Sequence, residues 1–247
     1  MEPVELIREG NYVIVVHYDE DAGSPRTEWD NFSTMVCFHR RYNLGDEQPN
    51  SMGEWLSAKL REVGLSKDTD AYYDFESELD NDSPSAIQKA FEMLENVMVS
   101  MPLYLYDHSG LRISTGSFSC PWDSGQVGFI YADKKNILKE FGGSNLTKDK
   151  IAKAIKLMES EVETYDLYLS GQVYGYEVKD ITDWAAYCEE NEIDLDDEGY
   201  EFKEFVDDAP EIDSCWGYYG YDHEESGLME NAMNAIEYAT EKEKKHA

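Results

Sequence analysis

Residues 119–141 read Ser-Cys-Pro-Trp-Asp-Ser-Gly-Gln-Val-Gly-Phe-Ile-Tyr-Ala-Asp-Lys-Lys-Asn-Ile-Leu-Lys-Glu-Phe. The β-branched and aromatic run 126–131 predicts a strand, because it is short and bounded by turn-forming residues. Asp133 can cap a following helix at its N-terminus, and Gly142 can end that helix in the left-handed conformation. This stretch therefore predicts a loop, a central strand and a capped helix in succession.

Two other aromatic segments resemble this strand. A second Ser-Gly-Gln-Val begins at Ser170 and precedes the aromatic run 174–178, and a third run covers 214–221. We expect the three strands to lie side by side in one sheet that the rest of the chain covers. The echo of four residues is too short to establish a repeat.

The remaining elements alternate irregularly. Further strands are predicted at Tyr12–Tyr18, whose continuous apolar run suits a strand buried on both faces, and at 34–39. A hairpin joins 103–106 to 111–115. Capped or amphipathic helices are predicted at 51–64, 83–98, 147–165, 182–191 and 224–244, whereas 68–82 reads as an acidic loop. The pattern predicts an α+β fold with a mixed, largely antiparallel sheet and covering helices, as a single compact domain over 1–247; a subdivision near residue 100 is the alternative.

Charge is the unusual property of the chain. It has 247 residues, with 53 acidic and 21 basic side chains and a net charge of −32. Such a surface repels nucleic acids and anionic membranes and attracts basic proteins. Because a duplex carries one charge per ~1.7 Å, 32 charges correspond to roughly 54 Å of DNA. A folded chain of this length has a radius of gyration near ~18 Å and a diameter of about 45 Å. The net charge thus approximates that of a DNA segment as long as the protein.

The sequence offers no catalytic constellation. Its four cysteines are widely spread without a C-x-x-C pair, and its five histidines fit no H-E-x-x-H frame. We therefore predict no enzyme activity, no cofactor and no metal. The absence of an apolar run of 18 residues and of a signal peptide predicts a protein of the cytoplasm, without a membrane contact.

The densest acidic segment is 180–213, where aromatic residues are interspersed with carboxylates. Residues 194–199 resemble the first half of an EF-hand loop, but Phe205 occupies the position of the bidentate Glu, which favours a plain acidic loop. We predict that this segment binds a partner protein through Asp183, Glu189, Glu190, Glu192, Asp194, Asp196, Asp197, Glu198, Glu201, Glu204, Asp207 and Asp208.

A second group of residues could dock a partner or a second copy of the chain. We interpret the pair Arg40-Arg41 as the most basic spot of the chain. Ion pairs with carboxylates of the same chain are the simpler explanation for these two arginines. Exposed Trp and Tyr side chains supply much of the binding energy at protein interfaces, although aromatic strand residues more often belong to a core. The candidates are Trp29, Arg40, Arg41, Tyr42, Trp122, Trp216 and Tyr218.

Several motifs together resemble a known group of proteins. They are Ser24-Pro25-Arg26 with the segment 40–46, the segment 122–131, and the segments 165–176 and 213–220. These resemble a family of small acidic, mostly uncharacterised proteins encoded by bacteriophages and conjugative elements, and the resemblance suggests an antirestriction or anti-defence role. The resemblance covers roughly a third of the chain. It implies a bacterial host cytoplasm and carries over no catalytic residues.

Three hypotheses about function follow. The first is an anti-defence inhibitor that binds a basic, nucleic-acid-binding host defence protein through a DNA-mimicking acidic surface, without contacting nucleic acid itself. The second is a metal-dependent hydrolase of a nucleotide or defence signal. The third is a non-enzymatic accessory protein of a mobile element. Self-association of the chain is compatible with each of them.

Overall fold

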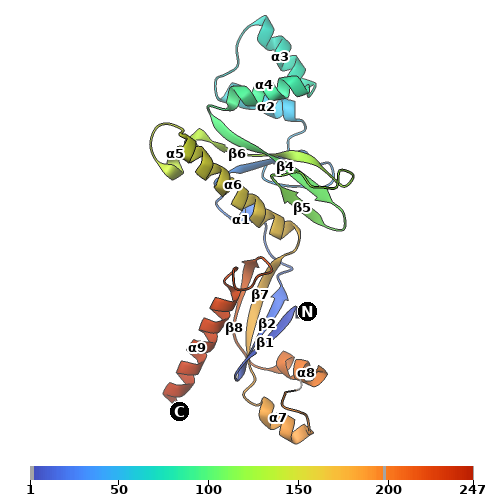
Figure 1. The fold of residues 1–247 in the computed structure, drawn as a ribbon, viewed down its shortest axis with the longest axis vertical. Coiled ribbons are helices and arrows are strands. Elements are labelled where there is room, and N and C mark those ends of the chain that lie inside the picture. Colours follow the sequence, from blue (N-terminus) through green and yellow to red (C-terminus); the bar gives the residue numbers. More distant parts are fainter. Residues whose placement is uncertain (1–2, 197–198, 247) are drawn as a thin grey trace. The chain divides into compact units, whose positions relative to one another are not determined.

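The structure is a computed structural model that describes residues 3–196 and 199–246. Its helices and antiparallel sheets confirm the α+β class (Figure 1). Contacts between Cα atoms divide the chain into two compact units. The central unit comprises 23–170, and the terminal unit comprises 1–22 together with 171–247. Residue 100 lies inside a strand of the central unit rather than at a boundary.

The central unit is built on a four-stranded antiparallel sheet of order β3-β6-β4-β5. Its strands are β3 (Thr34–Cys37), β6 (Ser124–Asp133), β4 (Met98–Asp107) and β5 (Leu111–Ser114). The predicted central strand is therefore β6, and the predicted hairpin is β4–β5. Helix α5 (Lys134–Phe141) follows β6 directly. It ends at Gly142, whose φ of +71° is positive as expected, although its ψ of 178° lies outside the left-handed helical conformation.

Successive side chains of β6 point to opposite faces of this sheet, because side chains alternate along a strand. Ile130 and Ala132 pack with α6 (Lys148–Leu169) and α5. Phe129 and Tyr131 pack with the opposite layer of helices. That layer consists of α2 (Met52–Glu62), α3 (Asp70–Asp80) and α4 (Pro84–Leu94). A short helix, α1 (Pro25–Glu28), contacts α6.

The prediction of an acidic loop at 68–82 is wrong, because most of it forms α3. The Thr69 hydroxyl accepts a hydrogen bond from the backbone N–H of Tyr72 at the start of the helix. Tyr72, Phe75 and Leu79 have helical spacing and are buried against α2 and α4. Tertiary packing of this apolar stripe outweighs the acidic composition of the other face.

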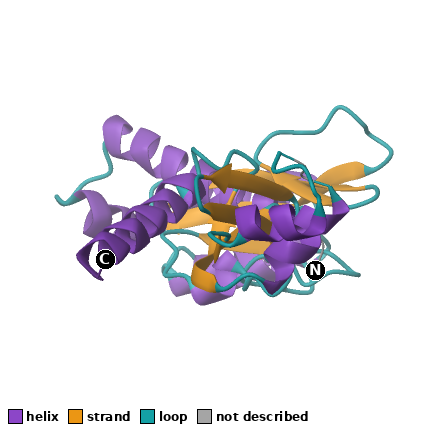
Figure 2. Cartoon of the chain, turned by 90° about the horizontal axis from the view of Figure 1, so that it is seen from below, coloured by secondary structure: helices purple, strands orange, loops and turns teal. Residues whose placement is uncertain are grey.

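The terminal unit contains a second antiparallel sheet, of order β1-β2-β7-β8. Its strands are β1 (Glu5–Glu9), β2 (Tyr12–Tyr18), β7 (Val173–Asp180) and β8 (Glu211–Tyr219). Helix α9 (Leu228–His246) packs on one face and runs to the C-terminal end (Figure 2). Helices α7 (Trp184–Asn191) and α8 (Tyr200–Asp208) cover part of the other face.

Strand β2 explains why both faces are covered. Ile14 and Val16 pack with α9, whereas Val13 and Val15 pack with α7 and α8. The prediction that this strand is buried on both faces is therefore confirmed. The prediction that the three aromatic strands share one sheet is wrong, because β7 and β8 pair in the terminal unit while β6 belongs to the central unit.

Candidate interaction surfaces

Helices α7 and α8 belong to the acidic segment 180–213, and their buried side chains attach that segment to the sheet; we call the two helices the platform. Trp184 and Phe202 are buried and meet nearly edge to face, with ring centroids 5.1 Å apart. Cys188 and Val206 are buried beside them against β2. The Trp184 indole N–H donates to the carbonyl of Leu195 at 3.1 Å, which ties the connection between the helices to the first helix. The apolar residues interspersed in this segment therefore anchor it to the sheet.

The predicted partner-binding carboxylates lie on the outer side of this platform. Asp197 and Glu198 fall outside the described residues. None of the other ten takes part in an ion pair within 3–196 and 199–246. All ten are exposed: Asp183, Glu189, Glu190, Glu192, Asp194, Asp196, Glu201, Glu204, Asp207 and Asp208. The structure thus presents these charges to solvent and leaves them without internal counter-ions.

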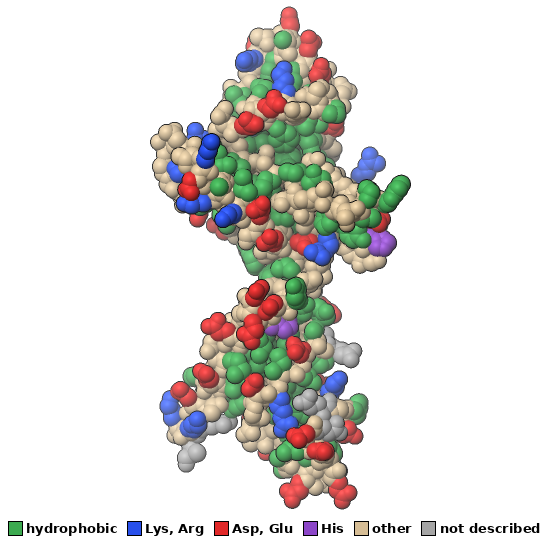
Figure 3. Space-filling view, viewed as in Figure 1, with side chains coloured by type: hydrophobic (Ala, Val, Ile, Leu, Met, Phe, Trp, Pro, Cys, Tyr) green, Lys and Arg blue, Asp and Glu red, His purple; other side chains and the backbone are tan. Residues whose placement is uncertain are grey.

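The negative charge is distributed very unevenly between the two units. The terminal unit has 29 acidic and 6 basic residues, which gives a net charge of −23, although it is the smaller unit. The central unit has 24 acidic and 15 basic residues, which gives −9. Asp and Glu side chains are spread over the terminal unit on the face shown in Figure 3. Most of the net negative charge of the chain therefore lies in its terminal unit.

The predicted docking residues do not form one site. Arg41, Tyr42 and Trp122 gather around a cavity of about 330 Å³ in the central unit. Trp122 lines this cavity and is 92% exposed. Arg41 and Tyr42 contact its wall by binding Asp107, at 3.6 Å from the guanidinium and 3.3 Å from the phenol.

The other predicted docking residues lie elsewhere. Trp29 is half exposed at the end of α1, and Arg40 is exposed in the segment after β3. Trp216 covers Gly175 so closely that any side chain there would meet its ring, and it stacks on His17 with centroids 6.0 Å apart. Tyr218 belongs to the opposite face, where it packs with α9.

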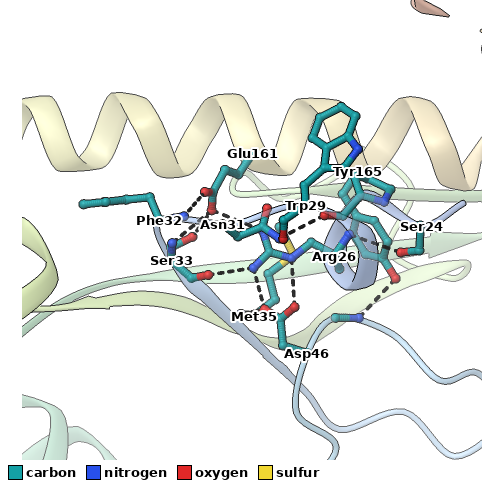
Figure 4. Close-up of polar contacts among 12 residues, drawn as sticks. Ser24, Arg26, Trp29, Asn31, Phe32, Ser33, Met35, Asp46, Glu161 and Tyr165 are labelled. Atoms are coloured by element: carbon teal, nitrogen blue, oxygen red, sulfur yellow. Dashed lines mark hydrogen bonds and ion pairs between the residues drawn. The ribbon is translucent and has the colours of Figure 1, made fainter. Parts of the chain in front are cut away.

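A buried ion network holds the central unit together beside α6 (Figure 4). The Arg26 guanidinium is almost wholly buried and binds Asp46 through two nitrogens and Glu161 at 3.1 Å. It also donates to the Ser33 carbonyl at 2.7 Å. Glu161 in turn accepts from the backbone N–H of Phe32 at 2.6 Å and from the Ser33 hydroxyl. These bonds fix α1, the start of β3 and α6 relative to one another.

Two titratable groups near this network have displaced pKa values. Burial, reinforced by the nearby Asp46 carboxylate, raises the pKa of the Cys37 thiol to about 12. Burial also raises the pKa of the Tyr165 phenol to about 12, although the phenol oxygen accepts a hydrogen bond from the backbone N–H of Gly45 at 3.1 Å. Both side chains therefore remain neutral at physiological pH and belong to the core.

Sequence reasoning overlooked a basic surface on the central unit. Residues 134–156 contain seven Lys and only two acidic residues, so the expectation that Arg40-Arg41 is the most basic spot is wrong. These lysines lie on α5 and the first part of α6, and basic side chains gather over α5 in Figure 3. Lys153 pairs with Asp149, and Lys150 donates to the carbonyl of Gly142 at the end of α5. A count of charges in short windows would have found this surface.

Within 3–196 and 199–246, no group of three or more His, Cys, Asp or Glu residues is arranged to hold a metal ion. No helix in the same ranges is long and apolar enough to cross a membrane. Comparison of the chain with family models, with curated proteins and with solved structures finds no match.

Proposed function

We propose that the protein is an inhibitor of a bacterial defence system, encoded by a phage or mobile element and acting in the host cytoplasm. It binds a basic, nucleic-acid-binding defence protein through the acidic surface of α7 and α8, in place of the nucleic acid. It acts by binding alone and performs no chemistry on its target.

One observation carries this proposal: ten carboxylates that the structure describes on or beside α7 and α8 are exposed and lack internal ion pairs. A protein that binds DNA phosphates through Lys and Arg side chains could bind these ten carboxylates in the same way, because they also are closely spaced negative charges. Complementary charge of this kind raises the rate of encounter and suppresses wrong partners. The resemblance to acidic phage and mobile-element proteins supports the choice of target class.

The anchoring of the platform supports the same proposal. Charges on a disordered tail would lose conformational entropy on binding, whereas Trp184 and Phe202 hold these helices on the sheet before any partner arrives. Preorganised carboxylates therefore bind a rigid basic groove more tightly than the same charges on a flexible tail.

A capture experiment with charge-matched variants tests the proposal. The protein would be immobilised and exposed to host lysate at about 0.1 M and at about 1 M salt, where the Debye length falls from ~10 Å to ~3 Å. Basic DNA-binding proteins should be retained only at the lower salt. The test variant Glu189→Gln, Glu190→Gln, Glu201→Gln, Glu204→Gln should retain less of them than a control that removes four exposed charges from the central unit. That control is Asp74→Asn, Glu78→Gln, Asp80→Asn, Glu92→Gln.

Equal retention by both variants, or capture that persists at the higher salt, would contradict the proposal. Catalytic turnover of a nucleotide that one carboxylate substitution abolishes would instead favour the hydrolase. An accessory protein would give no protection to a phage challenged by restriction or other defence systems.

A further inference from the structure

The cavity at the start of β6 is lined by two carboxylates, an exposed indole and a few apolar residues. Phe38, Leu105 and Val127 are its apolar lining residues, and Leu105 and Val127 are themselves buried. Asp107 and Asp123 line it as well. Its volume of about 330 Å³ lies at the lower end of the range for small-ligand sites.

Backbone pairing brings Asp107, at the end of β4, next to Asp123, which directly precedes β6. The backbone N–H of Asp107 donates to the carbonyl of Asp123 at 2.8 Å, next to the paired residues Tyr106 and Ser124. Side chains directly opposite in an antiparallel pair lie on the same face of the sheet, and like charges in that position destabilise it. A cation placed between the two carboxylates would relieve this repulsion.

The basic side chains nearest to these two carboxylates contact them only at long distances. Arg41 lies 3.6 Å from Asp107, and His108 lies 3.7 Å from Asp123. Elsewhere in the central unit, Arg112 binds Asp166 at 2.6 Å through two nitrogens. Short contacts of that kind are typical of strong charge-assisted hydrogen bonds, whereas contacts beyond 3.5 Å are not. Asp107 and Asp123 thus retain capacity for a further cation.

Trp122 completes the site. Its indole lines the cavity while remaining 92% exposed, a position that forgoes the usual burial of a large apolar side chain. The face of an indole attracts a cation that approaches it, and guanidinium groups stack on it well. An exposed indole in a cavity lined by two carboxylates is chemistry suited to a long cationic side chain.

We propose that this cavity binds one arginine side chain of a partner protein. The side chain of the arginine enters the cavity, and its guanidinium lies between the two carboxylates close to Trp122. Arginine suits the site better than lysine because its planar group donates to two carboxylates at once and stacks on an indole. Assigning this arginine to the basic defence protein rests on the proposed function, whereas the binding of the side chain rests on the cavity alone.

A peptide titration of the full chain tests this assignment. The probe is a capped Gly-Arg-Gly peptide, and its matched control replaces arginine with citrulline, which has nearly the same shape without the charge. Binding is followed through the NMR signal of the Trp122 indole N–H, identified from its loss in Trp122→Phe. We expect a saturable shift with the arginine peptide and none with the citrulline peptide.

Substitutions of the two carboxylates test whether their charges are needed for peptide binding. Asp107→Asn with Asp123→Asn should weaken binding at least tenfold, and Asp123→Asn alone should weaken it less. Asp74→Asn with Asp80→Asn removes two exposed charges from α3 of the same unit and should leave binding unchanged. Thermal unfolding of each variant verifies that it folds.

An unsaturable response, an equal response to citrulline, or full affinity in the folded double variant would overturn the assignment. The results for arginine binding can be distinguished from the results for the proposed inhibitor function. Arginine binding without salt-sensitive capture of any basic protein would support the cavity and contradict the inhibitor. Capture that depends on α7 and α8 together with no peptide binding would support the inhibitor and overturn the cavity.

Discussion

The ring of Trp184 meets the ring of Phe202 nearly edge to face, 5.1 Å between centroids, and this contact joins the two acidic helices of the terminal unit. Both side chains are buried against β2, so the carboxylates on the outer side of α7 and α8 share one apolar foundation. The position of the acidic surface therefore depends on packing rather than on its charges.

Replacing Phe202 with alanine should remove the packing between α8, Trp184 of α7 and β2. Deleting a buried aromatic ring costs about 3–5 kcal/mol through lost burial and a residual cavity. The free energy of unfolding, measured with denaturant, should fall by that amount. Tyr200→Ala changes an exposed ring on the same helix and should alter stability by less than about 0.5 kcal/mol, as is usual for a surface site. Equal losses in the two variants would mean that the interface of α7 and α8 is not packed as described.

The ion network around Arg26 should be far more sensitive than a surface pair. Arg26→Met leaves Asp46 and Glu161 without their buried counter-charge, and breaking a buried pair costs about 3–5 kcal/mol. The control Arg61→Met breaks a pair with Glu76 whose arginine is 60% exposed, which should cost no more than about 1 kcal/mol. Denaturant unfolding of both variants distinguishes them, and similar losses would contradict the burial of the network.

The raised pKa of Tyr165 predicts a loss of stability in alkali. The unfolded phenol ionises near its ordinary pKa of about 10, whereas burial raises the pKa of the folded phenol to about 12. Folding thus favours the neutral form, and its contribution is fully present below about pH 10 and is lost as pH rises toward 12. Thermal unfolding from pH 8 to 11 should decline less steeply in Tyr165→Phe than in the natural chain. Identical slopes would contradict a buried, neutral Tyr165.

Thiol reactivity should differ sharply among the four cysteines. Cys215 is exposed, whereas Cys37 is buried with a pKa raised to about 12, so its nucleophilic thiolate is scarce at neutral pH. A thiol reagent at pH 8 should modify Cys215 first and Cys37 only after unfolding, as mass spectrometry of peptides would show. Rapid labelling of Cys37 in the folded protein would mean that β3 is not in the core.

Local patterns predicted most of the elements. Ser51 and Thr147 accept the backbone hydrogen bonds expected of helix caps, and Tyr12–Tyr18 is a strand with the predicted bounds. The spacing of Tyr72, Phe75 and Leu79 also contained the signal for α3, but the surrounding carboxylates obscured it. Burial of that stripe, which composition does not reveal, decides the structure there.

Long-range relationships could not be predicted in the same way. The sequence of β6 or β7 alone does not indicate which strands pair. Their shared Ser-Gly-Gln-Val lies wholly within β6, whereas in the second copy only its Val belongs to β7. Arg26 and Glu161 are 135 residues apart, and Asp107 meets Asp123 only through strand pairing. Counting charges identifies the acidic segment in the sequence. The packing of its apolar residues against β2 becomes visible only in the folded structure.

Competition with duplex DNA tests the central claim most directly. A basic protein captured by the immobilised chain would be challenged with short duplex DNA, with a single-chain uncharged polymer as control. If the acidic surface occupies the DNA-binding groove, DNA should release the captured protein, and Glu189→Gln, Glu190→Gln, Glu201→Gln, Glu204→Gln should lower the DNA concentration needed. Retention of the captured protein at saturating DNA would contradict the account, because the two ligands would then bind at separate places.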